Sequence, residues 1–589
     1  SSHFGSSHFV SSRQVSSASR PVHPAAMAPR EPMTVSAYLL TRLRELGVEH
    51  AFGIPGDYVL PFFDELLDAP HGVQHIMPCN ELNGSYMADG YAKRRGFGAM
   101  AVTFGPGCLS AINGVAGAFA DDVPMVLVCG TPASGVLAKP TERLLHHAAG
   151  TNLDAFLEMF RPVTVRSERV ARAEEAAALI DDVLRQSYVE KKPCYLEIPY
   201  DVQFAEVSAP AGPLELARAL VEAGLRAALG RAAGLLGRAK TRSVVAGHLV
   251  LREGLSEEVL GLVSRLGASC ASTFGCKDGN FESSEQAVGI YSGRMSKEDV
   301  RAAIEGEDPS HVCLAVGLTY NEFDTGVFTS RLGRHNLIAI GHDRVVINGE
   351  VYLDVFMADF VRELIESCSA IPAVVPPQSR SPSFHYDSSV PILPTADDLT
   401  VDRMMLMFAH YFRAGDVLFG DAGGMINASQ CRLPLGVKMF GNGNWASIGA
   451  GFGTLVGASF TTSSQERLIG VLGDGALQMS AQEVSTLLKY RRDAALFVLN
   501  NAGYAAERAI HPGKYRSYND VQSWRYHLLG EAFGAQDGQY TGFEVWTELE
   551  LDGVLAALQV VRGVNIVNIH LDPDDLASFN KDFSEKLRH

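Results

Sequence analysis

The sequence contains no pair of cysteines spaced C-x-x-C, and its nine cysteines are an odd number among 589 residues. Zinc ribbons and thiol oxidoreductases depend on paired cysteines at that spacing, so the sequence argues against both classes. Unpaired cysteines in apolar segments are typical of buried, reduced thiols in a cytoplasmic protein. We therefore expect a cytoplasmic protein whose cysteines are buried thiols without a redox or zinc-binding role.

Basic residues are also scarce, since 50 Lys and Arg stand against 67 Asp and Glu, for a net charge of −17. Binding to nucleic acid or to an anionic membrane needs a basic surface, so we expect neither partner. Long apolar runs are missing too. The two uncharged stretches, residues 97–120 and 439–465, are interrupted by Gly, Asn or Gly-Pro-Gly, and we expect no membrane-spanning segment.

A chain of this length is too long for one hydrophobic core. Residues 1–33 are Ser-rich and lack the apolar run of a signal peptide, so we expect a disordered tail or tag. Two segments rich in Pro predict linkers at residues 208–215 and 370–398. The predicted domains are residues 34–207, residues 216–369, and residues 399–589 with a C-terminal tail.

Short apolar segments alternate with helical segments throughout these regions. In the first region, apolar residues 99–104, 125–130 and 194–199 predict strands, and residues 81–96 predict a helix that ends at a glycine. Strands that alternate with helices predict crossover connections and a parallel sheet. We therefore predict an α/β protein of three doubly wound parallel-sheet domains, a fold that does not by itself identify an activity.

The strongest chemical signal lies in the third region, where Gly473-Asp474-Gly475 follows an apolar strand and precedes a helix. The next apolar strand, residues 494–499, leads to Asn501. Neighbouring parallel strands bring their carboxyl ends together, where an Asp and an Asn can share a hard divalent cation. The glycines let the backbone approach a diphosphate at the helix N-terminus. Two unrelated turns are the competing interpretation, but the joint pattern favours one shared site.

This pattern resembles the diphosphate–magnesium motif of thiamine diphosphate enzymes. Further motifs occur in the order found in the 2-oxo-acid decarboxylase branch, which includes the pyruvate, indolepyruvate and phenylpyruvate decarboxylases. These motifs are GIPGDYVLPFFDEL, CNELNGSYMADGYAKRRG, RLLHHAAGTNLDAF, NWASIGAG and NNAGYAAERAIH. The resemblance extends from Thr34 to about Lys586. It implies a pyrimidine-binding domain, a middle domain and a diphosphate-binding domain.

The resemblance also implies the site residues. The implied catalytic residues are Glu81, which activates the cofactor, and a proton relay of Asp57, His146, His147 and Glu507. The implied cofactor-binding residues are Gly424, Ala446, Ile448 (the apolar residue under the cofactor's bend), Gly473, Asp474, Gly475, Ala476 and Asn501. The implied Mg²⁺ ligands are Asp474, Asn501 and the backbone of Gly503. Taken singly, each catalytic residue is more often an ordinary turn, surface or core residue, but five matches in order favour function.

The implied reaction is the decarboxylation of a 2-oxo acid to an aldehyde and CO₂. Ala422 and Gly424 stand where the branch usually has two threonines, and Ala506 stands where pyruvate-specific members have a bulky aliphatic residue. The smaller side chain at 506 suggests an acyl group larger than acetyl, such as a branched-chain or aromatic one. We expect Met425 and Ile426 to fill part of the added space.

Alternative functions stay open at this point. A carboligase would join the bound intermediate to a second carbonyl compound; the paired histidines and Glu507 argue against it, but the altered segment 421–426 leaves it open. A silent regulatory subunit would have no need of Glu81. We find no Gly-rich dinucleotide fingerprint in residues 216–369, and no phosphate-binding loop of the form G-x-x-x-x-G-K-[ST]. The resemblance further implies a homo-oligomer, dimer or tetramer, whose sites are shared between subunits.

Overall fold

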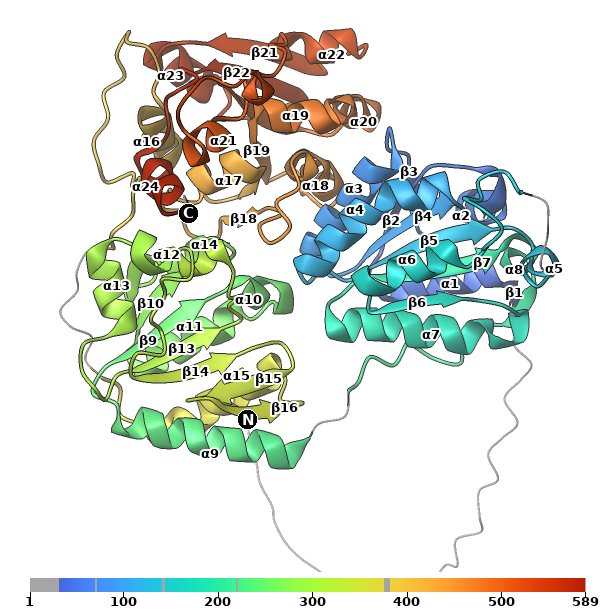
Figure 1. Cartoon of the computed structure of the whole chain (residues 1–589), viewed down its shortest axis with the longest axis horizontal. Coiled ribbons are helices and arrows are strands. Elements are labelled where there is room, and N and C mark those ends of the chain that lie inside the picture. The colour runs from blue at the N-terminus through green and yellow to red at the C-terminus, as the bar shows by residue number, and fades with distance from the viewer. Residues whose placement is uncertain (1–30, 69–70, 140–143, 219–220, 375–381, 588–589) are drawn as a thin grey trace, which may run out of the picture.

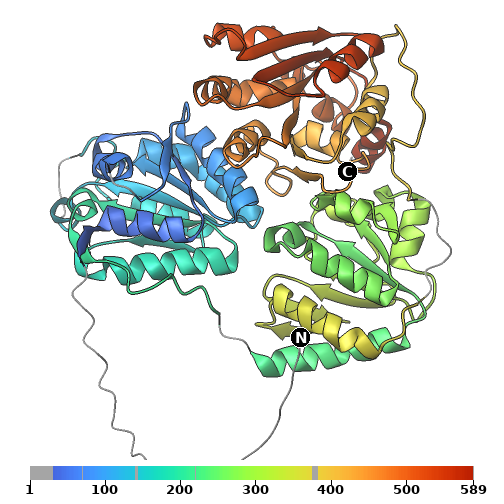
Figure 2. The same ribbon diagram turned by 180° about the vertical axis from the view of Figure 1, so that it is seen from behind.

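The computed structural model describes residues 31–68, 71–139, 144–218, 221–374 and 382–587. Residues 1–30 of the predicted tail and residues 375–381 of the second predicted linker lie outside these ranges. Figure 1 shows three α/β bodies, of which the first (blue to cyan) lies beside the third (orange to red). The middle body (green to yellow) lies below the third, and the view from behind in Figure 2 shows the long helix along its lower edge.

The first sheet has six parallel strands in the order β3-β2-β4-β5-β7-β6. Its strands are β2 (His50–Gly53), β3 (Gln74–Ile76), β4 (Gly98–Thr103), β5 (Met125–Thr131), β6 (Arg166–Arg169) and β7 (Cys194–Pro199). The helices on one face are α1 (Val35–Glu45), α2 (Leu60–Asp68) and α7 (Ala173–Glu190). Those on the other face are α3 (Glu81–Arg95), α4 (Pro106–Ala120) and α6 (Ala155–Phe160). Helices on both faces make this sheet doubly wound, as predicted.

The predicted tail extends too far into the chain. Strand β1 (Pro32–Thr34) pairs antiparallel with β8 (Glu206–Ser208), so residues 32 and 33 belong to folded structure. The sequence does not reveal this pairing because a three-residue strand has too little pattern to recognise.

The middle sheet has the order β12-β10-β9-β13-β14-β15-β16, in which β14, β15 and β16 pair antiparallel. Its strands are β9 (Arg242–Ala246), β10 (Ser269–Ser272), β12 (Ala287–Ile290), β13 (Val312–Val316), β14 (Asn336–Ile340), β15 (Arg344–Ile347) and β16 (Glu350–Leu353). The helices are α9 (Glu222–Arg238), α11 (Ser256–Leu266) and α15 (Met357–Ser367) on one face and α13 (Glu298–Glu305) on the other. The antiparallel edge departs from the predicted purely parallel sheet.

The third sheet has the order β11-β18-β17-β19-β20-β22-β21. Its strands are β11 (Lys277–Asp278), β17 (Asp416–Gly420), β18 (Lys438–Phe440), β19 (Arg467–Gly473), β20 (Ala494–Asn500), β21 (Tyr540–Val545) and β22 (Val564–His570). The helices are α18 (Ala450–Ser459) and α20 (Val484–Lys489) on one face, and α16 (Val401–Tyr411) and α23 (Glu548–Ala557) on the other. Strand β11 comes from the middle region and pairs antiparallel with β18, so the two regions share a sheet edge.

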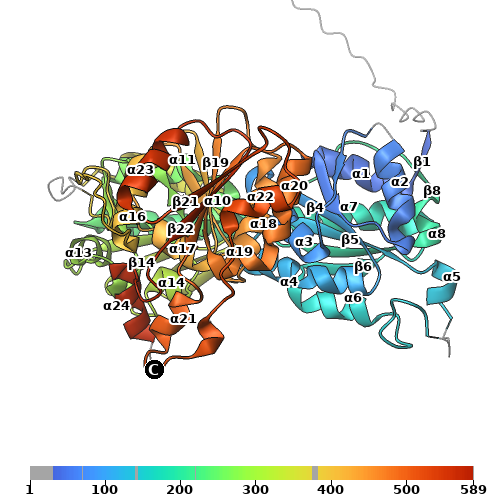
Figure 3. The same ribbon diagram turned by 90° about the horizontal axis from the view of Figure 1, so that it is seen from above.

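The first and third bodies are joined by helices α3 and α18, which Figure 3 shows side by side. Their backbones touch at glycines: a Cβ on Gly90 would lie 1.9 Å from the Thr454 carbonyl oxygen, and one on Gly457 would lie 1.9 Å from that of Met87. The cores of the two bodies are continuous across this contact. Only glycine permits so close an approach.

The described part of the second predicted linker packs against both neighbouring regions. The Ser383 backbone N–H donates to the Val288 carbonyl (2.9 Å), and the Tyr386 hydroxyl donates to Asp402 Oδ1 (2.5 Å). This segment therefore is a packed connection and not a loose one.

Among the described residues, no helix has both the length and the apolar composition needed to cross a membrane. The two uncharged stretches instead contain the buried helices α4 and α18. Eight of the nine cysteines are buried, as expected, but Cys79 is exposed, with its Sγ 3.2 Å from Ser485 Oγ.

Candidate functional site

Three neighbouring strands of the third sheet end in polar residues at the same edge. Strand β19 lies between β17 and β20 and is parallel to both. The residues that follow these strands or begin the next turn are Asp421, Asp474 and Asn501. The structure thus brings together the two residues predicted to hold a cation, and adds Asp421.

Asp474 is 1% exposed and is surrounded by backbone donors. Its carboxylate accepts hydrogen bonds from the N–H groups of Gly475 (2.7 Å) and Gly503 (3.0 Å). Burial raises the pKa of Asp474 to about 6, although these donors act in the opposite direction. Nearby, Asn501 Oδ1 is buried and has no hydrogen-bond partner among the residues that the structure describes. A buried carboxylate beside an unpaired amide oxygen is a donor set that fits Mg²⁺.

Arg508 was not predicted, yet it shapes the loop that carries the third proposed ligand. Its guanidinium donates to the carbonyls of Asn501 (3.2 Å) and Ala502 (3.1 Å) and to Asp520 Oδ1 (3.2 Å). Ala502 adopts a left-handed conformation (φ 57°) and Gly503 has φ 146°. These contacts orient the Gly503 backbone, and no sequence pattern identifies an arginine that bonds only to main-chain and loop groups.

The glycines predicted to approach the cofactor have different surroundings. A Cβ on Gly473 would meet nothing within 4 Å, so the backbone before Asp474 is open to a ligand. A Cβ on Gly475 would lie 2.6 Å from the Tyr504 ring, and one on Gly424 would lie 2.2 Å from the Val471 carbonyl. Gly424 therefore allows α17 (Ala422–Ala428) to pack against β19, and its cofactor contact stays a prediction.

Asp421 holds the loop that carries Ile448. It is 2% exposed, and its Oδ2 accepts hydrogen bonds from the N–H groups of Gly449 (2.9 Å) and Gly451 (2.7 Å). Oδ1 accepts from the Ala422 N–H (3.0 Å). Burial raises the pKa of Asp421 to about 6 against the effect of these donors. The carboxylate thereby sets the position of Ile448, a role that the altered sequence around it did not suggest.

Replacing Asp421 by Asn should weaken the binding of thiamine diphosphate. The amide has one oxygen for three N–H groups, and leaving a buried donor unpaired costs about 1–3 kcal/mol, or roughly five- to 150-fold in affinity. Titrating the apo-protein with cofactor and following tryptophan fluorescence measures the change, because Trp445 lies in the same loop.

The matched control is Asp387→Asn, since Asp387 is also buried and also accepts a backbone N–H, from Ser389. It lies in the connection between the second and third regions, and its replacement should leave cofactor affinity unchanged. Equal affinity of the Asp421→Asn variant and the unmodified protein would show that Asp421 does not set the loop.

The loop from Asn442 to Gly449 is also held from outside, by the first body of the same chain. The Trp445 Nε1–H donates to Asn113 Oδ1 (2.9 Å), and the hydroxyls of Tyr86 and Ser447 are 2.9 Å apart. Ala446 has φ 53° and Ile448 is partly exposed. Ile448 is therefore available to a ligand, while the residues around it are fixed.

In the first body, the structure brings together three residues of the predicted relay. His146 Nε2 lies 2.5 Å from Asp57 Oδ2, and His147 Nε2 lies 3.7 Å from Asp57 Oδ1. Burial favours the protonated carboxyl, but the hydrogen bond and charge of His146 outweigh it, and the pKa of Asp57 is lowered. Tyr58 stacks on the His146 ring at 5.0 Å. A carboxylate next to two imidazoles can pass protons in steps.

Glu81 lies in the first turn of α3, where Asn80 caps the helix. A Cβ atom added to Gly107 would lie 3.6 Å from Glu81 Oε1. Two residues near Glu81 are bound by the third body of the same chain, because the Cys79 N–H and the Asn83 amide both donate to Glu483 Oε1 (2.9 Å each).

The predicted site residues form two separate groups in one chain. Glu507 is exposed in the first turn of α21 (Ala505–Ile510), on the body that carries Asp474. Within the described ranges, no hydrogen bond or ion pair joins Glu81 or Asp57 to Asp474 or Glu507. One chain thus contains both halves of the predicted site without direct polar contact between them.

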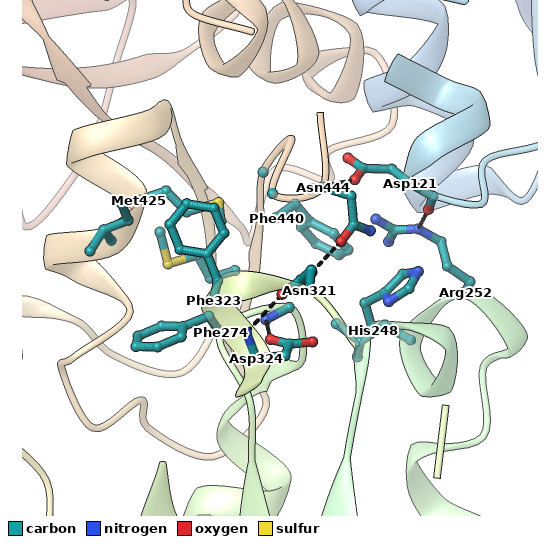
Figure 4. Close-up of a pocket in the computed structure, with 16 residues that line it drawn as sticks. Asp121, His248, Arg252, Phe274, Asn321, Phe323, Asp324, Met425, Phe440 and Asn444 are labelled. Atoms are coloured by element: carbon teal, nitrogen blue, oxygen red, sulfur yellow. Dashed lines mark hydrogen bonds between the residues drawn. The ribbon is translucent and has the colours of Figure 1, made fainter. Parts of the chain in front are cut away.

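Met425 and Ile426 line a cavity at the junction of the three bodies (Figure 4), and their part in the acyl pocket stays a prediction. Figure 4 shows Met425 beside the ring of Phe323, and Ile426 packs against the aromatic cluster that includes Phe274 and Phe323. The reason is that α17 turns these side chains toward the middle body.

Comparison with known proteins gives three family-model matches in chain order. The model described as the N-terminal binding domain of thiamine pyrophosphate enzymes matches residues 33–159. The model of the central domain matches residues 229–368, and that of the C-terminal binding domain matches residues 422–568.

Curated relatives match over most of their length. The chain is 33% identical to an alpha-keto-acid decarboxylase of Mycolicibacterium paratuberculosis, over 91% of this chain and 93% of the relative. It is 33% identical to an alpha-keto-acid decarboxylase of Mycobacterium tuberculosis, over 90% and 92%. It is 30% identical to a pyruvate decarboxylase of Aspergillus fumigatus, over 88% and 90%.

Proposed function

Since the chain belongs to the thiamine diphosphate-dependent 2-oxo-acid decarboxylases, we propose that it converts a 2-oxo acid bulkier than pyruvate into an aldehyde and CO₂, with Mg²⁺ holding the cofactor's diphosphate. The observation that carries the proposal is that the chain contains two groups of residues already arranged for these roles. One is the Asp474–Asn501–Gly503 edge with its unpaired oxygen, and the other is the cluster of Asp57 with two histidines.

Each group has a distinct part in the proposed mechanism. Thiamine diphosphate supplies the electron sink that a 2-oxo acid needs to lose CO₂. Asp474, Asn501 and the Gly503 carbonyl would hold Mg²⁺, and the open backbone at Gly473 would face the diphosphate. Ile448, fixed by its loop, would support the folded conformation of the cofactor.

The remaining residues act on protons. The Glu81 carboxyl would hold a proton at the cofactor's pyrimidine ring. Asp57, His146 and His147 would deliver a proton to the carbon that lost CO₂ and remove one from the product hydroxyl, with Glu507 completing the set. The short distances from Asp57 to His146 and His147 allow a proton to pass among these three side chains in steps.

The function is tested by following CO₂ and organic product together, by mass spectrometry, for a panel of 2-oxo acids with thiamine diphosphate and Mg²⁺. One aldehyde per CO₂ supports the proposal. An acyloin as the main product would assign the chain to the carboligases, the alternative that the altered segment 421–426 leaves open. Turnover of none of the acids by protein that binds the cofactor would contradict both.

The proposed bulky acyl group rests on the surroundings of position 506. Ala506 is exposed at the start of α21, next to Glu507. Replacing Ala506 by Ile should therefore lower kcat/KM for the largest substrate relative to pyruvate by at least about 10- to 200-fold, the value of one methylene in an apolar pocket, since Ile adds three carbon atoms. Steady-state kinetics with both acids measures this ratio. An unchanged ratio would show that position 506 does not line the acyl pocket.

The proposed active site is shared between two subunits, because one chain keeps its two groups apart and binds the residues near Glu81 through its own Glu483. Mixing Glu81→Gln subunits with Asp474→Ala subunits should restore activity. In random dimers about a quarter of the sites would combine two intact halves. Native mass spectrometry verifies the exchange of subunits.

A mixture of Glu81→Gln and Asp57→Asn subunits is the control. Both changes lie in the first body, so no site in such a mixture has an intact first half, and activity should stay low. Recovery in the control, or none in the test mixture despite exchange, would contradict a shared site.

A further inference from the structure

The residues Asp57, His146 and His147 have a property beyond proton transfer, since their ligand atoms all lie within 4.8 Å of one another. Two imidazole nitrogens and one carboxylate oxygen form a donor set that suits Zn²⁺ and similar borderline ions. Mg²⁺ prefers oxygen donors, so the set differs in kind from the Asp474–Asn501–Gly503 edge.

The spacing needs only small adjustments to accept an ion. Two donors at about 2.0–2.1 Å from a tetrahedral zinc lie about 3.3 Å apart. His147 Nε2 and Asp57 Oδ1 are 3.7 Å apart, and His146 Nε2 and Asp57 Oδ2 are 2.5 Å apart. The three side chains are 34–62% exposed, so an ion can reach them from solvent and their rotamers can adjust.

The surrounding structure holds the donors in this arrangement. His147 has φ 66°. Its carbonyl oxygen lies so close to Gly105 that a Cβ added to Gly105 would be 1.9 Å from that oxygen. The Tyr58 ring stacks on His146, and its hydroxyl lies 3.4 Å from Nδ1, the nitrogen that does not face Asp57. Metal-binding histidines are usually oriented by such a contact at the second nitrogen.

We propose that Asp57, His146 and His147 bind Zn²⁺ as a second metal site, with water at the fourth position, and that the bound ion inhibits the enzyme. Zn²⁺ takes the lone pairs on the two imidazoles and the carboxylate through which protons would pass. The inhibition rests on the proposed relay, whereas the binding depends only on the geometry. Zn²⁺ thus competes with protons for the side chains of Asp57, His146 and His147. It does not compete with Mg²⁺, whose proposed ligands are other residues.

The experiment is a calorimetric titration of the full-length holoenzyme with Zn²⁺, in thiamine diphosphate and excess Mg²⁺. The unmodified protein should bind one ion per chain at this site, and Co²⁺ in place of Zn²⁺ should give a visible absorption band that Zn²⁺ removes. His147→Asn should weaken binding about 100-fold, the upper range for loss of metal-site groups. Asn tolerates the left-handed backbone at 147, so this variant keeps the loop.

Two controls locate the ion. His410→Gln changes an exposed histidine elsewhere and should leave Zn²⁺ affinity unchanged. Asp474→Asn should also leave it unchanged, although it removes a proposed Mg²⁺ ligand. Equal affinity of the His147→Asn variant and the unmodified protein would overturn the site, as would loss of binding in Asp474→Asn.

Activity separates this proposal from the proposed function. In protein that decarboxylates a 2-oxo acid, Zn²⁺ should inhibit and chelation followed by Mg²⁺ should restore turnover; binding without inhibition would overturn the inhibitory role. In protein without turnover, Zn²⁺ binding that depends on His147 would support the site, while the proposed function alone would fail.

Discussion

Replacing Glu81 by Gln should lower kcat for the preferred 2-oxo acid by about 10²–10⁴-fold, the usual contribution of a positioned proton-transfer group. Gln has nearly the same shape but cannot hold and release a proton at the pyrimidine ring. The protein should stay folded, because the Glu81 side chain makes no hydrogen bond within the described residues and Asn80 still caps α3. CO₂ release at saturating cofactor measures the loss.

Glu174→Gln is the matched control, since Glu174 also lies in the first turn of a helix, α7, and is exposed. It makes the same chemical change in the same body and should leave kcat unaltered. If Glu81→Gln kept kcat within a factor of two, Glu81 would not be the activating residue. Cofactor affinity should be followed in parallel, because a loss confined to binding would assign Glu81 a structural role.

The second large effect concerns stability. Replacing Gly90 by Ala should lower the free energy of unfolding by about 3 kcal/mol, the upper part of the range for overpacked contacts. The new methyl group would lie 1.9 Å from the Thr454 carbonyl oxygen, so helices α3 and α18 must move apart. The loop of Ile448 spans the same two bodies, and cofactor binding should weaken with it. Calorimetric unfolding of the apo-protein measures the change.

Gly230→Ala makes the same substitution at an open position and should raise the free energy of unfolding. Gly230 lies within helix α9, and a Cβ there would meet nothing within 4 Å. Alanine at an open helical position stabilises by about 0.5–1 kcal/mol. A similar shift of the unfolding temperature for both variants would show that α3 and α18 do not pack backbone to backbone.

Hydrogen bonds around the cavity at the junction of the three bodies link the middle body to the two bodies that carry the halves of the site. Arg252 of the middle body donates to the Asp121 carbonyl of the first, and Asn321 donates to Asn444 Oδ1 in the loop of the third (2.5 Å). His248 lies 2.8 Å from Asp122. The middle body therefore contacts the first and the third bodies, which carry the predicted site residues, although it contributes none itself.

Local patterns in the sequence are enough to predict much of this protein. The apolar strands that end at Gly473 and Asn500 are recognisable because a buried parallel strand needs a continuous apolar run. Their adjacency follows from one intervening helical segment, and the structure pairs Gly473 with Leu499 across the two strands. The short edge strand β16 is not predicted, since a four-residue strand on an exposed edge has little apolar pattern.

The sequence by itself thus determined the alternating α/β architecture, the polar strand ends predicted to bind a cation, and the family, because these depend on short-range patterns and on motifs in order. The tertiary structure alone decided which residues meet across long separations. His146 reaches Asp57 over 89 residues, Asp421 supports the loop of Ile448, and Met425 faces the middle body. Such contacts depend on how helices dock and which way a short helix turns its side chains, and neither is encoded in any local stretch of residues.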